Sequence, residues 1–158
     1  MGLYQKMQTS SRLETEGIWL HIEDNRIRLA RAGGKNTKFI AAAEKIAREH
    51  KRAMDFMGEA QGRKIFGKLY AEIIVLDWLI QSNEGTLDEM GNPAGDDVAP
   101  EDRYVRGVPS PDGSVIEFNV QNIIQVFDDI PDLLRIIKET AEDASLFRKD
   151  LVKHIEGN

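Results

Sequence analysis

The glycine-rich turn Gly33-Gly34-Lys35 is the part of the sequence that most suggests a site for chemistry. A turn of this kind between a strand and a helix can direct backbone N–H groups at a phosphate. A phosphate-binding loop would need glycine at position 29 and Ser or Thr at position 36, where this chain has Leu29 and Asn36. We therefore interpret the turn as a tight strand-to-helix connection that requires a positive φ.

The other residue types that could do chemistry are scattered. His21, His50 and His154 lie far apart in the sequence and form no metal-binding spacing. Acidic pairs such as Asp96-Asp97 are typical of solvated loop charges, since nothing places one carboxylate of a pair in an apolar cleft. The chain has no G-x-S-x-G motif and no evident nucleophile with a base. The sequence predicts a non-catalytic protein without catalytic residues, metal or cofactor.

Composition narrows the class of protein further. The chain has 158 residues, of which 41% are hydrophobic, and it contains no cysteine, which excludes a disulfide framework and thiolate metal sites. Its most apolar run ends at Asp77, and residues 1–12 lack the apolar stretch of a signal peptide. We expect an intracellular protein without a membrane partner.

Charge is segregated along the chain, although the net charge is only -6. Residues 26–68 carry 12 Lys+Arg against 4 Asp+Glu, whereas residues 82–118 carry 2 against 9. The acidic segment could fold back over the basic one, or the basic face of one copy could meet the acidic loop of another in a homo-oligomer. A third interpretation is that both segments are solvated surfaces that contribute little.

Two short apolar runs, 17–22 and 26–31, flank Glu23-Asp24-Asn25 and predict a β-hairpin. Ile27 and Leu29 alternate with Arg26 and Arg28, so one face of the second strand should be buried and the other should carry cations. Residues 1–16 are mixed and polar, and we expect them to form a flexible arm.

Helical spacing follows the hairpin. It predicts an amphipathic helix from Asn36 to about His50, a buried helix from Ile65 to Ile80 that is apolar on nearly every side, a helix capped by Asn119, and a last helix from Asp132 to His154. Residues 82–114 are rich in Gly, Pro and Asp and predict a long acidic loop. The predicted fold class is α+β and mainly helical, with an N-terminal β-hairpin and about four helices around a buried central helix. Residues 17–158 would form this single domain.

Three ordered stretches resemble a known family, the tail assembly chaperones of long-tailed (siphovirus-type) bacteriophages. They are Gly17-Ile18-Trp19-Leu20 with 27–36 (IRLARAGGKN); 69–78 (LYAEIIVLDW); and Asp112-Gly113, Phe118-Asn119, 130–134 (IPDLL) and 144–148 (ASLFR). The match spans roughly residues 13–158, with the stretches in the order typical of the family. The loop 82–111 departs from the family by being longer than its usual Asp-Gly turn.

The resemblance implies a function without catalysis. Such proteins act in the host cell cytoplasm, bind the tape measure protein, recruit tail tube subunits to it, and are usually absent from the finished virion. In many relatives a ribosomal frameshift adds a second domain that reaches the tube protein. We therefore expect a phage tail assembly chaperone that forms a homo-oligomer and has the tape measure protein and the tail tube protein as partners.

Contacts with these partners are predicted on the basic helix 36–52 and at aromatic side chains. The candidate protein-binding residues are Arg31, Lys45, Arg48, Lys51, Arg52, Trp78, Phe127 and Phe147. The edges of the helices 65–80 and 132–154 are the candidate contacts between copies.

Two other classes share the absence of chemistry. One is a minor structural tail or connector protein of the virion, and the other is a small nucleic-acid-binding regulator that uses the basic segment. Nucleic-acid binding is disfavoured because the nearby aromatic residues Phe39 and Tyr70 fall on apolar helix stripes, where they serve a core, and not on an exposed face.

Overall fold

The computed structural model describes residues 2–50, 59–148 and 155–156 of the chain. Its α-helices are α1 (Leu3–Met7), α2 (Ser11–Glu16), α3 (Thr37–Glu49), α5 (Glu59–Leu69), α6 (Val120–Asp129) and α7 (Pro131–Glu142). Its strands are β1 (Ile18–Ile22), β2 (Asn25–Leu29), β3 (Val75–Gln81), β4 (Tyr104–Arg106), β5 (Val108–Pro109), β6 (Val115–Ile116) and β7 (Ile155–Glu156). The predicted α+β, mainly helical class with an N-terminal hairpin is confirmed.

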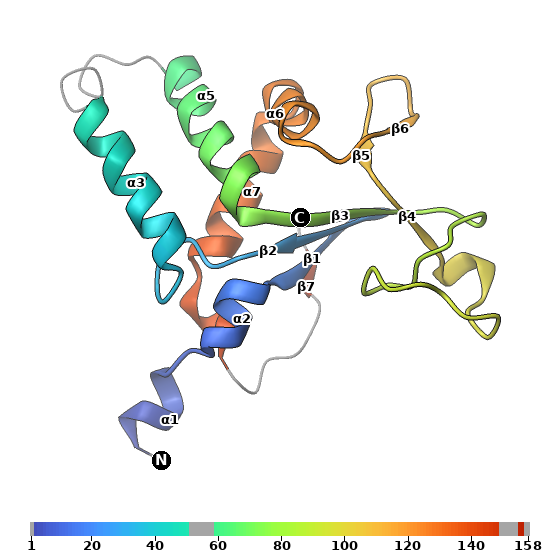
Figure 1. Ribbon diagram of the computed structural model, residues 1–158, viewed down its shortest axis with the longest axis horizontal. Coiled ribbons are helices and arrows are strands. Elements are labelled where there is room, and N and C mark those ends of the chain that lie inside the picture. Colours follow the sequence, from blue (N-terminus) through green and yellow to red (C-terminus); the bar gives the residue numbers. More distant parts are fainter. Residues whose placement is uncertain (1, 51–58, 149–154, 157–158) are drawn as a thin grey trace.

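A mixed sheet lies at the centre of the molecule, with strand order β4-β3-β2-β1-β7. The first four strands of that order pair antiparallel, whereas β7 pairs parallel to β1. A separate two-stranded ribbon is formed by β5 and β6. Figure 1 shows α3, α5, α6 and α7 on one side of the sheet, and the connection between β3 and β4 on the other.

The helix-covered face of the sheet forms the main core. Leu20, Ile27 and Trp78 are cross-strand neighbours on this face, and all three are buried. They pack in one cluster with buried side chains of α6 and α7, including Phe127 and Ile137. The alternation predicted for the second hairpin strand therefore holds, because its apolar positions face the helices.

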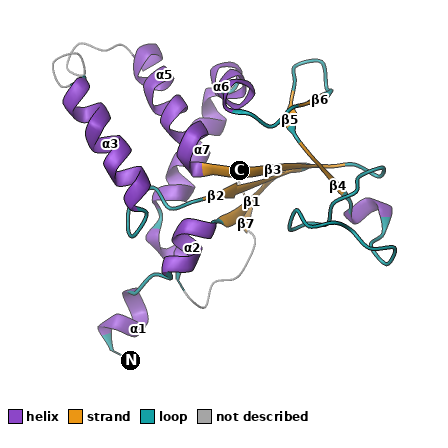
Figure 2. Cartoon of the chain, in the orientation of Figure 1, coloured by secondary structure: helices purple, strands orange, loops and turns teal. Residues whose placement is uncertain are grey.

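The opposite face of the sheet carries Arg26, Arg28 and Asp77 together with the buried Trp19 and Leu79. The connection between β3 and β4, which occupies residues 82–103, covers part of this face (Figure 2). Arg26 donates to the carbonyl oxygen of Glu89 at 2.8 Å and forms an ion pair with its carboxylate at 3.3 Å. Asp77 accepts two hydrogen bonds from the Arg106 guanidinium, at 2.8 and 3.0 Å. The acidic segment thus folds back over part of the basic one within a single chain.

The stretch 65–80 is not one helix, which corrects the predicted buried central helix. Here α5 ends at Leu69, a single π-helical turn spans Tyr70–Ile74, and the chain continues without a loop into β3. Because β3 lies between β2 and β4 and has helices on one face and the β3–β4 connection on the other, its sequence is apolar without a clear period.

The N-terminal residues and the last helix also differ from prediction. The expected arm 1–16 contains α2, whose Leu13 packs with Ile18 and Phe147. The last helix ends at Glu142 and is followed by a 3-10 turn, Ala144–Phe147; residues 149–154 of the predicted helix lie outside the described residues. The predicted loop 82–114 also holds short elements, among them β4 and β5. No helix in the described part of the chain is long and apolar enough to span a bilayer.

Candidate protein-binding site

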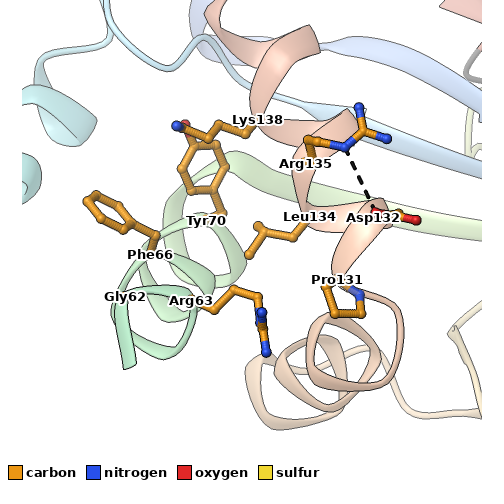
Figure 3. A pocket seen from close by; sticks show the side chains of 9 residues that line it. All are labelled: Gly62, Arg63, Phe66, Tyr70, Pro131, Asp132, Leu134, Arg135 and Lys138. Carbon is orange, nitrogen blue, oxygen red and sulfur yellow. Dashed lines mark ion pairs between the residues drawn. The ribbon is translucent and has the colours of Figure 1, made fainter. Parts of the chain in front are cut away.

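A groove between α5 and α7 is the candidate functional site, and we call it the α5–α7 groove. It has a volume of about 340 Å³, and its lining comes from α5 with the following π-helical turn and from the start of α7 (Figure 3). The lining residues are Gly62, Arg63, Phe66, Tyr70, Pro131, Asp132, Leu134, Arg135 and Lys138. The two helices therefore bring together residues about 70 positions apart.

The floor of the groove is apolar and is set by helical spacing. Residues 63, 66 and 70 lie three and four positions apart and so share one face of the helix and its π-helical continuation. Tyr70 and Leu134 are buried, whereas Phe66 remains 37% exposed although it is a large hydrophobic residue. The Phe66 ring therefore leaves apolar surface within reach of another molecule, next to the charged residues of the lining.

The rim of the groove is cationic. Arg135 lies 3.9 Å from Asp132 and 3.5 Å from Glu139, and Lys138 lies 3.9 Å from Glu142. The side chains of Arg135 and Lys138 are 58% and 52% exposed, so these ion pairs are screened by water and contribute little to stability. Both cations can therefore be recruited by an incoming carboxylate at low cost.

The Tyr70 hydroxyl at the floor is a neutral group. Burial, with the negative charge of Glu142 nearby, raises the pKa of Tyr70 well above its usual value. The hydroxyl donates a hydrogen bond to Glu142 Oε1 at 3.4 Å. The phenol thus stays protonated across the physiological range and serves packing and hydrogen bonding, not nucleophilic or base chemistry.

A second groove lies on the other flank of α5, against α3, and has a volume of about 470 Å³. Its apolar part includes the half-buried Ile46 and Ile65. Its charged lining includes Lys45, Lys64, Lys68, Glu49 and Glu72. Along α3, whose residues are all described, no side chain is fully buried, so the apolar face predicted for this helix is only partly covered.

Three of the predicted contact residues lie in the core instead of on a surface. Trp78, Phe127 and Phe147 are 1%, 2% and 0% exposed, which corrects their assignment as partner contacts. The Trp78 indole donates to Asn25 Oδ1 at 3.0 Å and so ties the hairpin to β3. These three aromatic side chains therefore pack inside the domain and are not accessible to a partner.

The predicted cationic contacts have different positions. Arg31 donates to the carbonyl oxygen of Ala141 at 3.0 Å and lies 5.7 Å from the centre of the Phe147 ring, so it holds the end of α7 against the sheet. Lys45 and Arg48 are exposed on α3. The remaining two, Lys51 and Arg52, lie outside the described residues.

The glycine-rich turn is occupied by a carboxylate of the same chain. Glu14 on α2 is fully buried, and its Oε2 accepts the backbone N–H of Lys35. Gly34 has φ +53°, and a Cβ at this position would collide with the Glu14 carboxylate. The turn therefore needs glycine, as predicted, and its anion is internal.

Other arrangements for chemistry are not assembled in the described residues. Within residues 2–50, 59–148 and 155–156, no group of three or more His, Asp or Glu side chains could hold a metal ion. His21 lies on β1 and His50 follows α3, so the fold does not bring these two imidazoles into one cluster, and His154 lies outside the described residues.

Sequence reasoning missed the residues that carry the α5–α7 groove, namely Arg63, Phe66, Arg135 and Lys138. The available signal was that Arg135 and Lys138 border the apolar stripe of the last helix, but only the packing of α5 beside α7 shows that they border a groove. Comparisons with protein-family models, with curated proteins and with solved structures found no match for this chain.

Proposed function

We propose that this protein is a non-catalytic assembly chaperone for the tail of a long-tailed phage. It binds the tape measure protein in the host cell cytoplasm, helps to recruit tail tube subunits, and is absent from the mature virion. The observation that carries this proposal is the α5–α7 groove, which offers a partner an apolar floor and a cationic rim.

The chemistry of the expected partner matches such a groove. A tape measure protein is long, helical and apolar before the tube surrounds it, as the family resemblance implies. An amphipathic helix of this kind binds by laying its apolar face into a hydrophobic groove. Phe66 supplies exposed apolar area for that contact, and Arg135 and Lys138 supply charge at its edge.

Two of the stretches that resemble the family contribute to the groove: 69–78 supplies Tyr70, and 130–134 supplies Pro131, Asp132 and Leu134. The other segments lie elsewhere in the fold. The Arg31–Lys35 segment connects β2 to α3, Asp77-Trp78 lies in β3, and Pro131-Asp132-Leu133 opens α7 beside the groove. The residues Tyr70, Pro131, Asp132 and Leu134 therefore support a role for two of the resembling stretches in building the groove.

Association between copies is part of the proposal, because several chaperones would be needed along one tape measure protein. Arg26 already pairs with Glu89 within its own chain, so the acidic connection is partly committed to internal contacts. We expect copies to meet through the helical layer instead. Light scattering after size exclusion measures the copy number.

The test is co-expression with the tape measure protein encoded by the same phage. The wild-type chain should keep that protein soluble and co-elute with it in several copies. Phe66→Asp should abolish co-elution, because it places a carboxylate on the apolar floor. Val115→Asp is the matched control, since Val115 is another exposed hydrophobic residue, 43% exposed, and lies in the β5–β6 ribbon away from the groove.

A second variant tests the predicted contact on the basic helix. Changing Lys45, Arg48, Lys51 and Arg52 together to glutamate should abolish co-purification if this helix carries the interaction. If the tape measure protein stays insoluble and the chain elutes as a free monomer, the chaperone proposal is wrong. Mass spectrometry of purified virions then decides whether the protein is a structural component of the particle.

A further inference from the structure

We infer that the α5–α7 groove selects an amphipathic helix whose apolar stripe is flanked by carboxylates. This inference rests on the proposed function for its biological partner, since the tape measure protein would supply the helix. The recognition chemistry itself depends only on the groove.

The dimensions of the groove fit one helix. The helix α5 has 11 residues and so offers a wall of about 16 Å, or three turns of an opposing helix. The groove volume of about 340 Å³ accommodates a few apolar side chains above Phe66 and Leu134. A bound helix would thus cover the exposed part of the Phe66 ring.

The charge of the lining indicates which residues should flank the apolar stripe of the bound helix. Arg63 comes from α5, and Arg135 and Lys138 come from α7, so cations line both walls (Figure 3). Among the nine described residues that line this groove, Asp132 is the only acidic one, and its side chain is 86% exposed. The acidic partners Glu139 and Glu142 belong to α7 but are not part of the lining. The described part of the lining thus holds three cations and one carboxylate, while Glu139 and Glu142 lie 3.5 and 3.9 Å from Arg135 and Lys138. Carboxylates on a helix in the groove would compete with these exposed ion pairs for the cations of the lining.

The α3–α5 groove does not offer the same selectivity. Glu49 and Glu72 line it together with its lysines, and they lie 3.9 Å from Lys45 and Lys68 respectively. An acidic helix placed there would meet two carboxylates among the lining residues that the structure describes, against one in the α5–α7 groove. This difference assigns the acidic helix to the α5–α7 groove.

The experiment uses two helical peptides of about 16 residues, a length at which an isolated helix is marginally stable. Both carry the same leucine stripe at helical spacing; one has flanking glutamates and the other has flanking lysines. By fluorescence anisotropy, the full-length protein should bind the glutamate peptide at least about tenfold more tightly than the lysine peptide. Raising the salt concentration should reduce that preference.

Charge reversal of the lining should invert the preference. The variant Arg63→Glu, Arg135→Glu, Lys138→Glu should bind the lysine peptide more tightly than the glutamate peptide. The control variant Lys6→Glu, Arg12→Glu, Lys38→Glu changes the net charge equally at exposed positions on α1, α2 and α3, and its preference should match the wild type. If the triple lining variant does not fold, Arg135→Glu with Lys138→Glu changes only exposed side chains and should reduce the preference severalfold.

Several outcomes would overturn the inference. Equal binding of both peptides to the wild type, or an equal loss in the control variant, would show that the groove does not read charge. If Phe66→Asp splits a dimer that the glutamate peptide cannot dissociate, a second copy fills the groove. If the lining variant still solubilises the full-length tape measure protein, the proposed function stands and this inference is wrong. If the wild type itself does not solubilise that protein, the proposed function is wrong, and the peptide-binding experiment alone decides the inference.

Discussion

Two groups of cations in this molecule differ in how fully their own chain satisfies them. On the face of the sheet away from the helices, Arg26 is buried under the β3–β4 connection. Arg106 on the same face, although its side chain is 44% exposed, is bound to Asp77 through two hydrogen bonds. Beside the α5–α7 groove, Arg135 and Lys138 are half exposed and form longer ion pairs of 3.5 to 3.9 Å. We call these the closed group and the open group.

The difference teaches that charge along a sequence does not tell which charges are available to a partner. Arg26 belongs to the basic segment that suggested an interaction surface, yet carbonyl and carboxylate oxygens of Glu89 use its hydrogen-bonding capacity. The open group includes residues outside that segment. Availability follows from the geometry of pairing and from burial, not from local charge density.

We expect the largest effect on stability from removing Asp77, the carboxylate that binds Arg106 of the closed group. Asp77→Ala should lower the free energy of unfolding by about 3 kcal/mol, because it removes a buried acceptor of two Arg106 bonds and of the Trp78 N–H. Urea denaturation measures the change. Glu139→Ala, which removes an exposed partner of Arg135, is the control and should cost less than about 0.5 kcal/mol. Similar losses in both variants would erase the distinction.

Glu14 is a buried carboxylate whose Oε2 is bound by its own chain. Glu14→Ala should lower the free energy of unfolding by about 2 kcal/mol, because the Lys35 N–H loses its acceptor in a partly buried hydrogen bond. Glu14→Gln keeps an acceptor oxygen and should cost less. Amide hydrogen exchange of residues 11–16 should rise in the alanine variant, and unchanged exchange there would show that α2 is held by its apolar contacts alone.

The α5–α7 groove beside the open group should behave in the reverse way: a change there should affect binding and have little effect on stability. Phe66→Asp should weaken binding of the tape measure protein by at least about tenfold, equivalent to about 1.4 kcal/mol. Its unfolding midpoint in urea should stay close to that of the wild type, because Phe66 is partly exposed already. A large drop in stability with unchanged binding would assign Phe66 to the core.

Within the open group, a single ion pair should matter least to the fold. Arg135→Gln should change the free energy of unfolding by less than about 0.5 kcal/mol, because its pairs with Asp132 and Glu139 are exposed. Thermal unfolding at low and high salt measures this, and the variant should also lose part of the wild type's salt sensitivity. A loss above about 1 kcal/mol would place Arg135 with the closed group.

Asp112 is an exposed charge that its own chain nevertheless satisfies. Hydrogen bonds from the Ser110 and Ser114 side chains lower the pKa of Asp112 to about 2. The carboxylate therefore supports this turn above its ordinary pKa of 3.8, and that support is lost as the pH falls toward 2. An NMR titration should show the low pKa, and Ser110→Ala should move it upward.

Local signals in the sequence predicted the elements that local interactions determine. Asn36 and Asn119 each cap a helix where the periodic stripe begins, and both side chains accept the expected backbone N–H. The hairpin followed from its alternation and turn residues. In the stretch 65–80, however, the residues of β3 are apolar because other elements cover both faces of the strand, and an apolar run without a period fits a buried helix equally well.

The candidate site could not be predicted from local sequence patterns, because long-range packing forms it. Lys45 and Arg48 were recognised because they share one helix, whereas the α5–α7 groove joins Arg63 to Arg135 and Lys138 through long-range packing. Trp78 and Phe147 were predicted as contact residues because they are large and aromatic. Their burial depends on strands and helices that are distant in the sequence. The docking of Glu14 against Gly34 likewise depends on a contact across 20 residues.

The chain passes directly from α5 through the π-helical turn into β3, and this connects the groove rigidly to the sheet. Phe66 and Tyr70 line the groove, and Asp77, only seven residues after Tyr70, holds Arg106 on the far face. No loop between them absorbs a displacement, because helix, π turn and strand follow one another without a break. A partner that shifts α5 would therefore pull on the central strand and, through it, on the acidic connection that covers the opposite side of the molecule.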